Sequence, residues 1–456
     1  MKQKVLFVNH ALGGGIEKHM RELAACLQDE MAVLTLRPSG PEGVVLRVGT
    51  ERQGEGLCFP FPGHYKALLK VCGLLRVSRV HFHHLMGFHP VIRKLAKDLG
   101  LPYDITLHDF HLIHSNPTMN DENGRFYQES VKGDESRDRS HSTPGVLMPR
   151  EWREGQTDFL GAAERVFVPS EFAARLFLDH FPDLDLIIAW HPDWERNAPY
   201  PNPRRIRLEG NRPMKVASIG MLSKEKGADL FEACAKQAKR RHLPLEFHLI
   251  GYALRPLTRS IKVHGMYEDR ELGGLISEMD PHVIWFPAQW PETYSYTLSA
   301  ALESGRPLVV PNIGAFGERV EGRPLTRVEP WDQPVDQWLK VFLDLKKEMA
   351  GMEIGEEERP WEDQRESNQG FAYSSDYMAP APEERDQGDD TFSEEMEWLH
   401  SYACWDERDG RETILRCLFR LSQVPVIAGL LNLIPYHRRR QIKRFFSRKP
   451  IHEIAR

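Results

Sequence analysis

Short apolar segments alternate with segments of helical periodicity along most of the chain, and no other feature of the sequence constrains the fold as strongly. Strand patterns that alternate with helix patterns are typical of βαβ units, in which helices cover a parallel sheet. In the first half of the chain, the patterns predict strands at Val5–Asn9, Met31–Leu36, Val80–His84, Tyr103–Leu107 and Arg165–Pro169, and helices at Glu17–Gln28 and Ser170–His180. Ser170 is the predicted N-cap of the second helix, because its hydroxyl can accept a hydrogen bond from a backbone N–H of the first turn.

A segment rich in proline and arginine, Pro192–Pro213, interrupts the alternation and is the predicted linker between two domains. Beyond it the patterns predict strands at Met214–Ile219, Leu245–Ile250, Val283–Phe286 and Pro307–Val310, and helices at Gly227–Arg241, Glu268–Met279 and Ser295–Glu303. We therefore expect two doubly wound α/β domains, at residues 1–195 and 212–345. Folds of this kind bind ligands beyond the carboxyl ends of their strands and in the cleft between the domains.

The composition is that of a packed globular protein, with 41% hydrophobic and 28% charged residues in a chain of 456. These proportions exclude a disordered chain, and the length excludes a small scaffold held together by disulfides. A net charge of −6 gives no global reason to expect nucleic acid as a partner. The six cysteines include no Cys-x-x-Cys pair, which argues against a zinc ribbon and favours a reducing compartment.

The apolar segment at the N-terminus is too short for a signal peptide and has no cleavage pattern. No window of the sequence reaches the roughly 18 apolar residues that a membrane-spanning helix needs. We therefore expect a cytoplasmic protein, and any contact with the inner face of the cell membrane is expected to be peripheral.

Two segments depart from the alternation. Asn120–Glu154 is polar and follows a predicted strand, so it is either a long loop that overhangs the ligand site or a disordered segment. Residues 346–397 are predicted to be an acidic segment that crosses between the domains, and Glu353–Glu397 contains 16 acidic and 3 basic residues, a net charge of −13. The aromatic residues of Phe371–Met378 could anchor part of it.

Residues 398–456 are predicted to form a basic, amphipathic helical extension. Arg411–Arg456 contains 11 basic and 2 acidic residues, and apolar and basic stretches adjoin within residues 418–449. This pattern is typical of a helix that lies on a membrane surface and attracts anionic lipid headgroups. The alternative interpretation is a helix that docks on the acidic segment or on a partner protein.

Three motifs stand where a predicted strand leads into a predicted helix. Gly13–His19 contains three glycines, Ile219–Gly227 is a basic loop at the equivalent turn of the second domain, and Trp290–Val310 comprises a polar loop, a helix and a strand. Glycines let backbone N–H groups approach a phosphate, and a helix N-terminus favours negative charge. Taken singly, the first loop is equally well interpreted as a tight turn, and the lysine of the second as an ordinary surface residue.

Taken together and in this order, the motifs resemble those of glycosyltransferase family 4, retaining enzymes with the GT-B fold of two Rossmann-like domains facing across a cleft. Gly14–Glu17, Gly220–Gly227 and Glu292–Val310 stand at the places of the three family motifs. Smaller matches extend the resemblance from Lys4 to Val328, at Thr106–Asp109, Val168–Phe172, Leu249–Gly251, Val263–Gly265 and Gly314–Glu318. The resemblance is closest to a bacterial subgroup associated with polysaccharide assembly.

The resemblance implies a site for a nucleoside diphosphate sugar that needs no metal and no other cofactor. The implied catalytic residues are His108, which would touch the donor sugar, Glu292, which would hold it, and Lys226, which would neutralise the diphosphate. The implied donor-binding residues are Gly14, Gly15, Gly220, Thr293, Tyr294, Ser295 and Glu303.

Two positions depart from the family pattern. Met221 stands where the family usually has an arginine, and Ala300 stands where it has a carboxylate on the ribose hydroxyls. Loss of the ribose contacts corresponds to about 1.5–3 kcal/mol, a tenfold to hundredfold weaker interaction. Glu303 lies one helical turn further along and could reach part of the same space.

Several histidines cluster in the stretch His81–His89, but we do not predict a metal site there. His83 and His84 are adjacent after a predicted strand, and adjacent strand residues point to opposite faces, which is poor geometry for chelation.

The predicted function is transfer of a sugar from a nucleoside diphosphate sugar to a growing glycan or lipid-linked glycan, as in bacterial surface polysaccharide, with a retaining mechanism. The first domain would bind the acceptor and the second the nucleotide sugar. A catalytically degenerate GT-B protein that acts as a partner or scaffold in glycan assembly is the main alternative, because of Met221 and Ala300. A sugar-nucleotide epimerase of the same fold is a lesser one.

Overall fold

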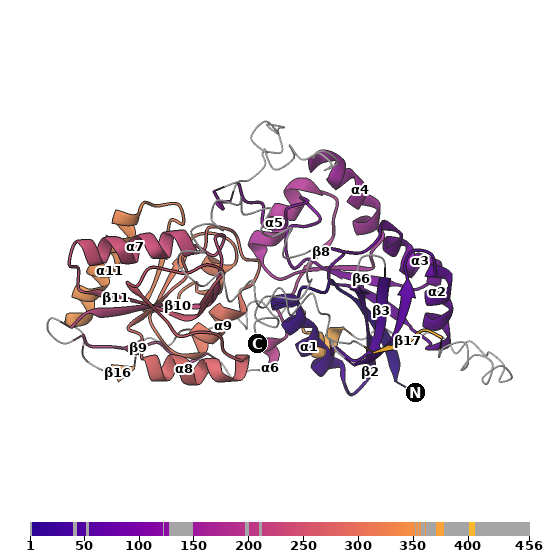
Figure 1. The fold of residues 1–456 in the computed structure, drawn as a ribbon, viewed down its shortest axis with the longest axis horizontal. Coiled ribbons are helices and arrows are strands. Elements are labelled where there is room, and N and C mark those ends of the chain that lie inside the picture. The colour runs from indigo at the N-terminus through magenta and orange to yellow at the C-terminus, as the bar shows by residue number, and fades with distance from the viewer. Residues whose placement is uncertain are drawn as a thin grey trace.

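The computed structural model describes residues 2–39, 43–51, 54–121, 123–126, 149–196, 200–208, 212–351, 353, 355–356, 361, 371–377 and 401–405. These residues form two domains that stand side by side, each built on its own sheet (Figure 1). The predicted α/β fold class, with two Rossmann-like doubly wound domains, is confirmed.

The sheet of the first domain has nine strands in the order β17-β4-β3-β2-β1-β5-β6-β7-β8. Its central strands are parallel, and β1 pairs with β2 on one side and with β5 on the other. The carboxyl ends of β1 and β5 therefore border a switch point of the kind at which such sheets bind ligands. The strands are β1 (Gln3–Val8), β2 (Met31–Ser39), β3 (Gly43–Val48), β4 (Glu55–Pro60), β5 (Arg79–Phe82), β6 (Tyr103–Thr106), β7 (Arg165–Val168), β8 (Leu186–Ile188) and β17 (Ala403–Trp405).

Helices cover both faces of this sheet, because successive side chains of a strand point to opposite faces. Val5 and Phe7 of β1 pack with α1, whereas Leu6 and Val8 belong to the core that includes α2, α3 and α5. The helices of the first domain are α1 (Gly15–Leu27), α2 (Tyr65–Leu74), η1 (Pro90–Lys94), α3 (Leu95–Leu99), α4 (Pro149–Gly161), α5 (Glu171–His180) and α6 (Asp193–Arg196). Ser170 caps α5 as predicted, and its Oγ accepts a hydrogen bond of 3.3 Å from the N–H of Ala173.

The second domain repeats this plan with six parallel strands in the order β12-β11-β10-β13-β14-β15. Val216 of β10 packs with α7 and α11 on one face, and its neighbour Ala217 packs with α8 and α9 on the other. The elements are β10 (Met214–Leu222), α7 (Ala228–Arg240), β11 (Leu245–Ala253), β12 (Ile261–Val263), η4 (Asp269–Glu271), α8 (Leu272–Met279), β13 (Val283–Trp285), α9 (Tyr296–Glu303), β14 (Leu308–Pro311), α10 (Phe316–Arg319), β15 (Thr326–Glu329) and α11 (Val335–Ala350).

The outer edge of the first sheet was not predicted. β3 and β4 form an antiparallel extension beyond β2, and β17 pairs antiparallel with β4. Cys58 of β4 and Cys404 of β17 are joined by a disulfide across this edge. The sequence analysis did not predict this disulfide, because residues 346 positions apart in the sequence become neighbours only in the sheet.

A short segment of the predicted acidic region returns to the first domain. Phe371, Tyr373 and Tyr377 are buried against Val5 and Phe7, and Tyr373 begins the short helix α12 (Tyr373–Asp376). The expectation that these aromatic residues anchor part of the acidic region is confirmed.

The two irregular segments contain more structure than expected. Of the predicted loop Asn120–Glu154, the described C-terminal part is helical, because α4 already begins at Pro149. The predicted linker Pro192–Pro213 contains α6 and the strand β9 (Arg204–Arg205), which pairs with β16 (Gly355–Glu356).

Apart from residues 401–405, the predicted extension 398–456 and its segment 418–449 lie outside the described residues. Within the part of the chain that the structure describes, no helix has the length and apolar character needed to cross a membrane.

Candidate functional site

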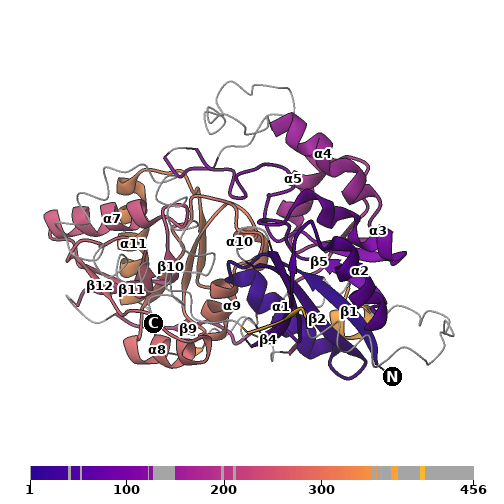
Figure 2. The ribbon, with the colours of Figure 1, turned by 45° about the vertical axis from the view of Figure 1, so that its right-hand side comes forward.

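The glycine motif of the first domain forms the N-terminus of α1. Gly14 is the N-cap and has φ of 87°, a left-handed conformation that favours glycine. A Cβ on Gly15 would lie 3.7 Å from the ring of Tyr296, so the start of α1 faces the N-terminal end of α9 in the other domain. Figure 2 shows α1 and α9 next to each other where the domains meet.

The basic loop of the second domain leaves β10 and ends at α7. Gly220 and Gly227 both have positive φ, and a Cβ on Gly227 would lie only 1.9 Å from the carbonyl oxygen of Pro287. Glycine at this position therefore lets the loop pass close to the end of β13. The loop places Nζ of Lys226 2.9 Å from Oε1 of Glu292, so the predicted cation and the predicted carboxylate form an ion pair.

The Gly314–Glu318 motif packs against the backbone of Glu292 and forms a hydrogen bond with it. The N–H of Ala315 donates a 2.9 Å hydrogen bond to the carbonyl of Glu292, and a Cβ on Gly314 would lie 2.5 Å from that same oxygen. Glu292 is 7% exposed, whereas the side chain of Lys226 is 31% exposed. The carboxylate is thus nearly covered, and the ammonium group keeps access to solvent.

The loop from Thr293 to Tyr296 belongs to the second domain and forms hydrogen bonds with the first. Oγ1 of Thr293 donates a 2.6 Å hydrogen bond to the carbonyl of His108, which follows β6. The hydroxyl of Tyr296 donates to Glu22 of α1 at 2.7 Å, and the hydroxyl of Tyr294 donates to Asp193. The structure therefore brings His108 to the loop that carries Glu292.

A buried arginine supports this loop, and the sequence analysis missed it. Nη1 of Arg319 donates 2.9 Å hydrogen bonds to the carbonyls of Tyr294 and Ser295, and its guanidinium lies 3.9 Å from the centre of the Tyr294 ring. Ser295 has φ of 74°, which is unusual for a residue other than glycine. Arg319 thus fixes a strained loop directly before the N-terminus of α9. The helix predicted from Ser295 to Glu303 is confirmed by α9, which begins at Tyr296. No spacing in the sequence distinguishes this arginine from others.

His108 lies among other histidines of the first domain. Its Nε2 is 3.2 Å from Nδ1 of His83, and burial lowers its pKa well below the usual range, so the ring is neutral. His84 instead contacts Asp109, with its Nε2 3.1 Å from one carboxylate oxygen, and His89 caps η1. The histidines of the stretch His81–His89 therefore have different partners.

The remaining predicted position lies apart from the loop. Glu303 is the last residue of α9 and is exposed, whereas the loop lies at the other end of this helix. Ala300 and Met221 are partly buried on α9 and β10.

Glu318 of the second domain contacts the first domain at the start of α5. Its two carboxylate oxygens accept hydrogen bonds of 3.2 and 3.1 Å from the N–H groups of Glu171 and Phe172. Burial raises the pKa of Glu318 to about 7. Burial outweighs the two hydrogen bonds, which favour the carboxylate, so the folded state favours the protonated carboxyl. The stability that this protonation contributes is fully present below the ordinary pKa of 4.5 and is lost as pH rises through about 7.

We expect the melting temperature of the wild-type protein to fall relative to that of Glu318→Gln when the pH is raised from 5 to 8. The neutral amide does not ionise, so the variant lacks this contribution to the pH dependence. Thermal unfolding followed by circular dichroism at both pH values measures the difference. Parallel pH profiles of the two proteins would contradict the assignment.

One protein-family model and several solved structures are similar to this chain. Residues 13–192 match the sequence model of Glycosyltransferase Family 4. No curated protein sequence gave a significant match. Similar solved structures include Anabaena Alr3699/HepE in complex with UDP and glucose, with 12% identity and a TM-score of 0.47 over 81% of this chain and 96% of that one. A glycosyltransferase from Rickettsia africae has 13% identity and a TM-score of 0.48 over 82% and 95%. The catalytic domain of starch synthase IV from Arabidopsis thaliana, bound to ADP and acarbose, has 12% identity and a TM-score of 0.45 over 81% and 98%.

The family match covers the first domain, from the glycine turn before α1 to the residue after His191. The segments that contain Lys226, Glu292 and His108 meet at one junction between the two domains. Over residues 13–192, the chain is similar to Glycosyltransferase Family 4.

Proposed function

We propose that the protein is a family 4 glycosyltransferase that moves a sugar from a nucleoside diphosphate sugar to a growing glycan, with retention at the anomeric carbon. The observation that carries the proposal is the ion pair of Lys226 and Glu292. Thr293, the residue after Glu292, donates a hydrogen bond to the carbonyl of His108, which keeps His108 near this pair. A cation for a leaving diphosphate and a carboxylate for sugar hydroxyls are thus next to each other.

In this proposal, Lys226 provides the positive charge that a departing diphosphate needs, rather than a metal ion. Its ammonium group is partly exposed, so it can exchange Glu292 for a phosphate oxygen. The N-termini of α1 and α9 lie at the same junction and add favourable potential for an anion. Gly14 and Gly15 leave the first turn of α1 accessible, because they carry no side chains.

The sugar is proposed to lie against the Glu292 loop. The carboxylate of Glu292 would accept hydrogen bonds from sugar hydroxyls once Lys226 turns to the diphosphate, and the N–H groups of Thr293, Tyr294 and Ser295 lie next to it. His108 would contact the sugar from the first domain. A neutral imidazole serves this role, because it can donate or accept a hydrogen bond without adding charge.

The acceptor is proposed to be a bacterial surface polysaccharide or its lipid-linked precursor, bound by the first domain. The motif resemblance supports this proposal, and the basic composition of residues 418–449 supports attachment to the inner face of the cell membrane, where such precursors are held. Ala300 and Glu303 leave the contacts to the ribose weaker than in the family pattern, so we expect the diphosphate and sugar to dominate donor affinity.

Calorimetric titration with UDP, GDP and dTDP tests the donor site. We expect saturable binding of one nucleotide and at least about tenfold weaker binding by Lys226→Ala, because a charge-assisted contact to phosphate is lost. Lys262→Ala is a matched control, since Lys262 is also paired with a glutamate, at 3.0 Å, but its side chain is 65% exposed on β12.

Absence of binding by any nucleotide at millimolar concentration would contradict the proposal. The alternative, a catalytically degenerate protein that acts as a partner in glycan assembly, would then account for Met221 and Ala300. Equal losses in Lys226→Ala and Lys262→Ala would show that the site lies elsewhere.

A further inference from the structure

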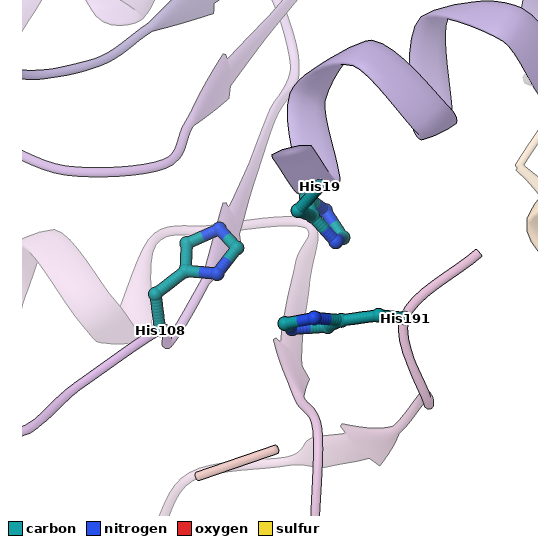
Figure 3. Close-up of side chains that lie close together, drawn as sticks. All are labelled: His19, His108 and His191. Carbon is teal, nitrogen blue, oxygen red and sulfur yellow. The ribbon is translucent and has the colours of Figure 1, made fainter. Parts of the chain in front are cut away.

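Three histidines from separate elements of the first domain converge on one point. His19 lies on α1, His108 follows β6, and His191 follows β8 (Figure 3). The centre of the His19 ring is 4.7 Å from that of His108 and 4.6 Å from that of His191, and the last two are 5.5 Å apart. One ring nitrogen from each residue lies within 4.8 Å of the other two.

Five of the six ring nitrogens of this cluster lack hydrogen-bond partners among the described residues. Within the described part of the chain, neither nitrogen of His19 or His191 has a partner, nor does Nδ1 of His108. The three residues are 0%, 9% and 4% exposed in the order His19, His108 and His191. Buried polar groups are normally paired, because each unpaired one costs about 1–3 kcal/mol.

Packing alone does not account for the cluster. The rings meet at interplanar angles of 60–73°, and such edge-to-face contacts are favourable by about 0.5–1.5 kcal/mol each. Apolar rings would make the same contacts without leaving five nitrogen atoms unpaired in the interior. A ligand that binds several nitrogen atoms at once does account for them.

The arrangement matches the coordination chemistry of a transition metal. Imidazole nitrogen suits Zn²⁺, Cu²⁺ and Ni²⁺, whereas Mg²⁺ and Ca²⁺ prefer oxygen. Three nitrogens at about 2.1 Å from a tetrahedral Zn²⁺ are about 3.4 Å apart, so small rotations of the side chains bring these rings into position. The Nε2 of His108 already faces His83 at 3.2 Å, as ligating histidines commonly use their second nitrogen to fix the ring.

We propose that His19, His108 and His191 form a binding site for one transition-metal ion, with Zn²⁺ as the probe. Three protein ligands leave a fourth position of the ion open. This site is separate from the cation at the diphosphate, which Lys226 provides. Because His108 belongs to both sites, zinc and the donor sugar are expected to compete; this one consequence rests on the proposed function.

Zinc binding is measured on the full chain without an affinity tag, freed of metal by a chelator and in the absence of nucleotide. Competition with a chromophoric chelator gives the affinity, and elemental analysis after gel filtration gives the stoichiometry. We expect one Zn²⁺ per chain, an increase in melting temperature with Zn²⁺, and no effect of Mg²⁺. The variants His19→Asn and His191→Asn are expected to bind Zn²⁺ at least about tenfold more weakly.

His242→Asn is the matched control. His242 is exposed in the second domain with φ of 52°, a conformation that asparagine adopts readily, so zinc binding should not change. Nucleotide binding by His191→Asn is measured in parallel. If zinc binding is lost and nucleotide binding is retained, His191 serves the zinc site and not the nucleotide site. A failure of nucleotide binding in the wild type leaves the zinc result unaffected.

Substoichiometric zinc on the wild type, or equal affinity in His19→Asn, His191→Asn and His242→Asn, would overturn the proposal. Circular dichroism establishes whether each variant is folded. Should the buried substitutions unfold the chain, the visible spectrum of Co²⁺ bound to the wild type decides: intense bands of a four-coordinate ion support the site, and the weak bands of six-coordinate Co²⁺ refute it.

Discussion

The variant Glu292→Gln is expected to transfer sugar about ten- to hundredfold more slowly while its affinity for the free nucleoside diphosphate changes little. The amide keeps the size of the side chain but loses the charge-assisted hydrogen bonds that the carboxylate is proposed to make with the sugar. Such bonds are each equivalent to about 1.5–3 kcal/mol, which corresponds to that range of rates. Steady-state transfer assays with the nucleotide sugar, together with calorimetry of the nucleotide, measure the two effects.

The contrast with Lys226→Ala makes this prediction specific. Lys226 is proposed to contact the diphosphate, so its loss should weaken nucleotide binding as well as transfer. Glu278→Gln serves as the control, because Glu278 is exposed on α8. Transfer by Glu292→Gln at the wild-type rate would remove Glu292 from the donor site.

The largest expected effect on stability comes from Asp104 of β6. This carboxylate is fully buried between Arg79 of β5 and Arg165 of β7, with 2.8 Å from each guanidinium to one of its oxygens. Replacing it with Asn removes the carboxylate that Arg165 pairs with and leaves Arg79 paired with Glu164 alone, at 2.6 Å. We expect the free energy of unfolding of the first domain to fall by about 3–5 kcal/mol, as measured by urea denaturation.

Hydrogen exchange would locate this loss, with reduced protection expected in β6 and β7. Glu154→Gln is the control, because the pair of Glu154 with Arg150 on α4 is exposed on both sides and contributes at most about 1 kcal/mol. A decrease below about 1 kcal/mol for Asp104→Asn would show that the two arginines find other partners.

The features that the sequence predicted are local ones. The period of apolar residues depends on neighbours a few positions away, and it located the parallel strands and the helices that pack on them. Ser170 as the cap of α5 and the start of α9 near Ser295 were likewise readable, because each motif lies within one turn of its helix. The motif resemblance implied one donor site that contains Lys226 and Glu292, and these two side chains lie 2.9 Å apart.

The features that the sequence did not reveal depend on contacts between distant segments. The disulfide of Cys58 with Cys404 requires β17 to return to the edge of the first sheet. The triad of His19, His108 and His191 comes from elements far apart in the sequence, and none of the three spacings resembles a metal-binding motif. Arg319 became recognisable only once its hydrogen bonds to the loop were visible.

The return of the chain to the first domain affects how the protein can be made and divided. Residues 371–377 complete the core on one face of the first sheet, and β17 completes its edge, yet both are synthesised after the whole second domain. In topological terms, the second domain is an insertion within the first. A ribosome must therefore release more than 400 residues before the first domain has all its parts, and a fragment that stops at residue 195 would expose Val5, Phe7 and Phe167 to water. A circular permutant in which residues 371–405 precede the N-terminus would reduce the number of residues that must be synthesised before the first domain is complete.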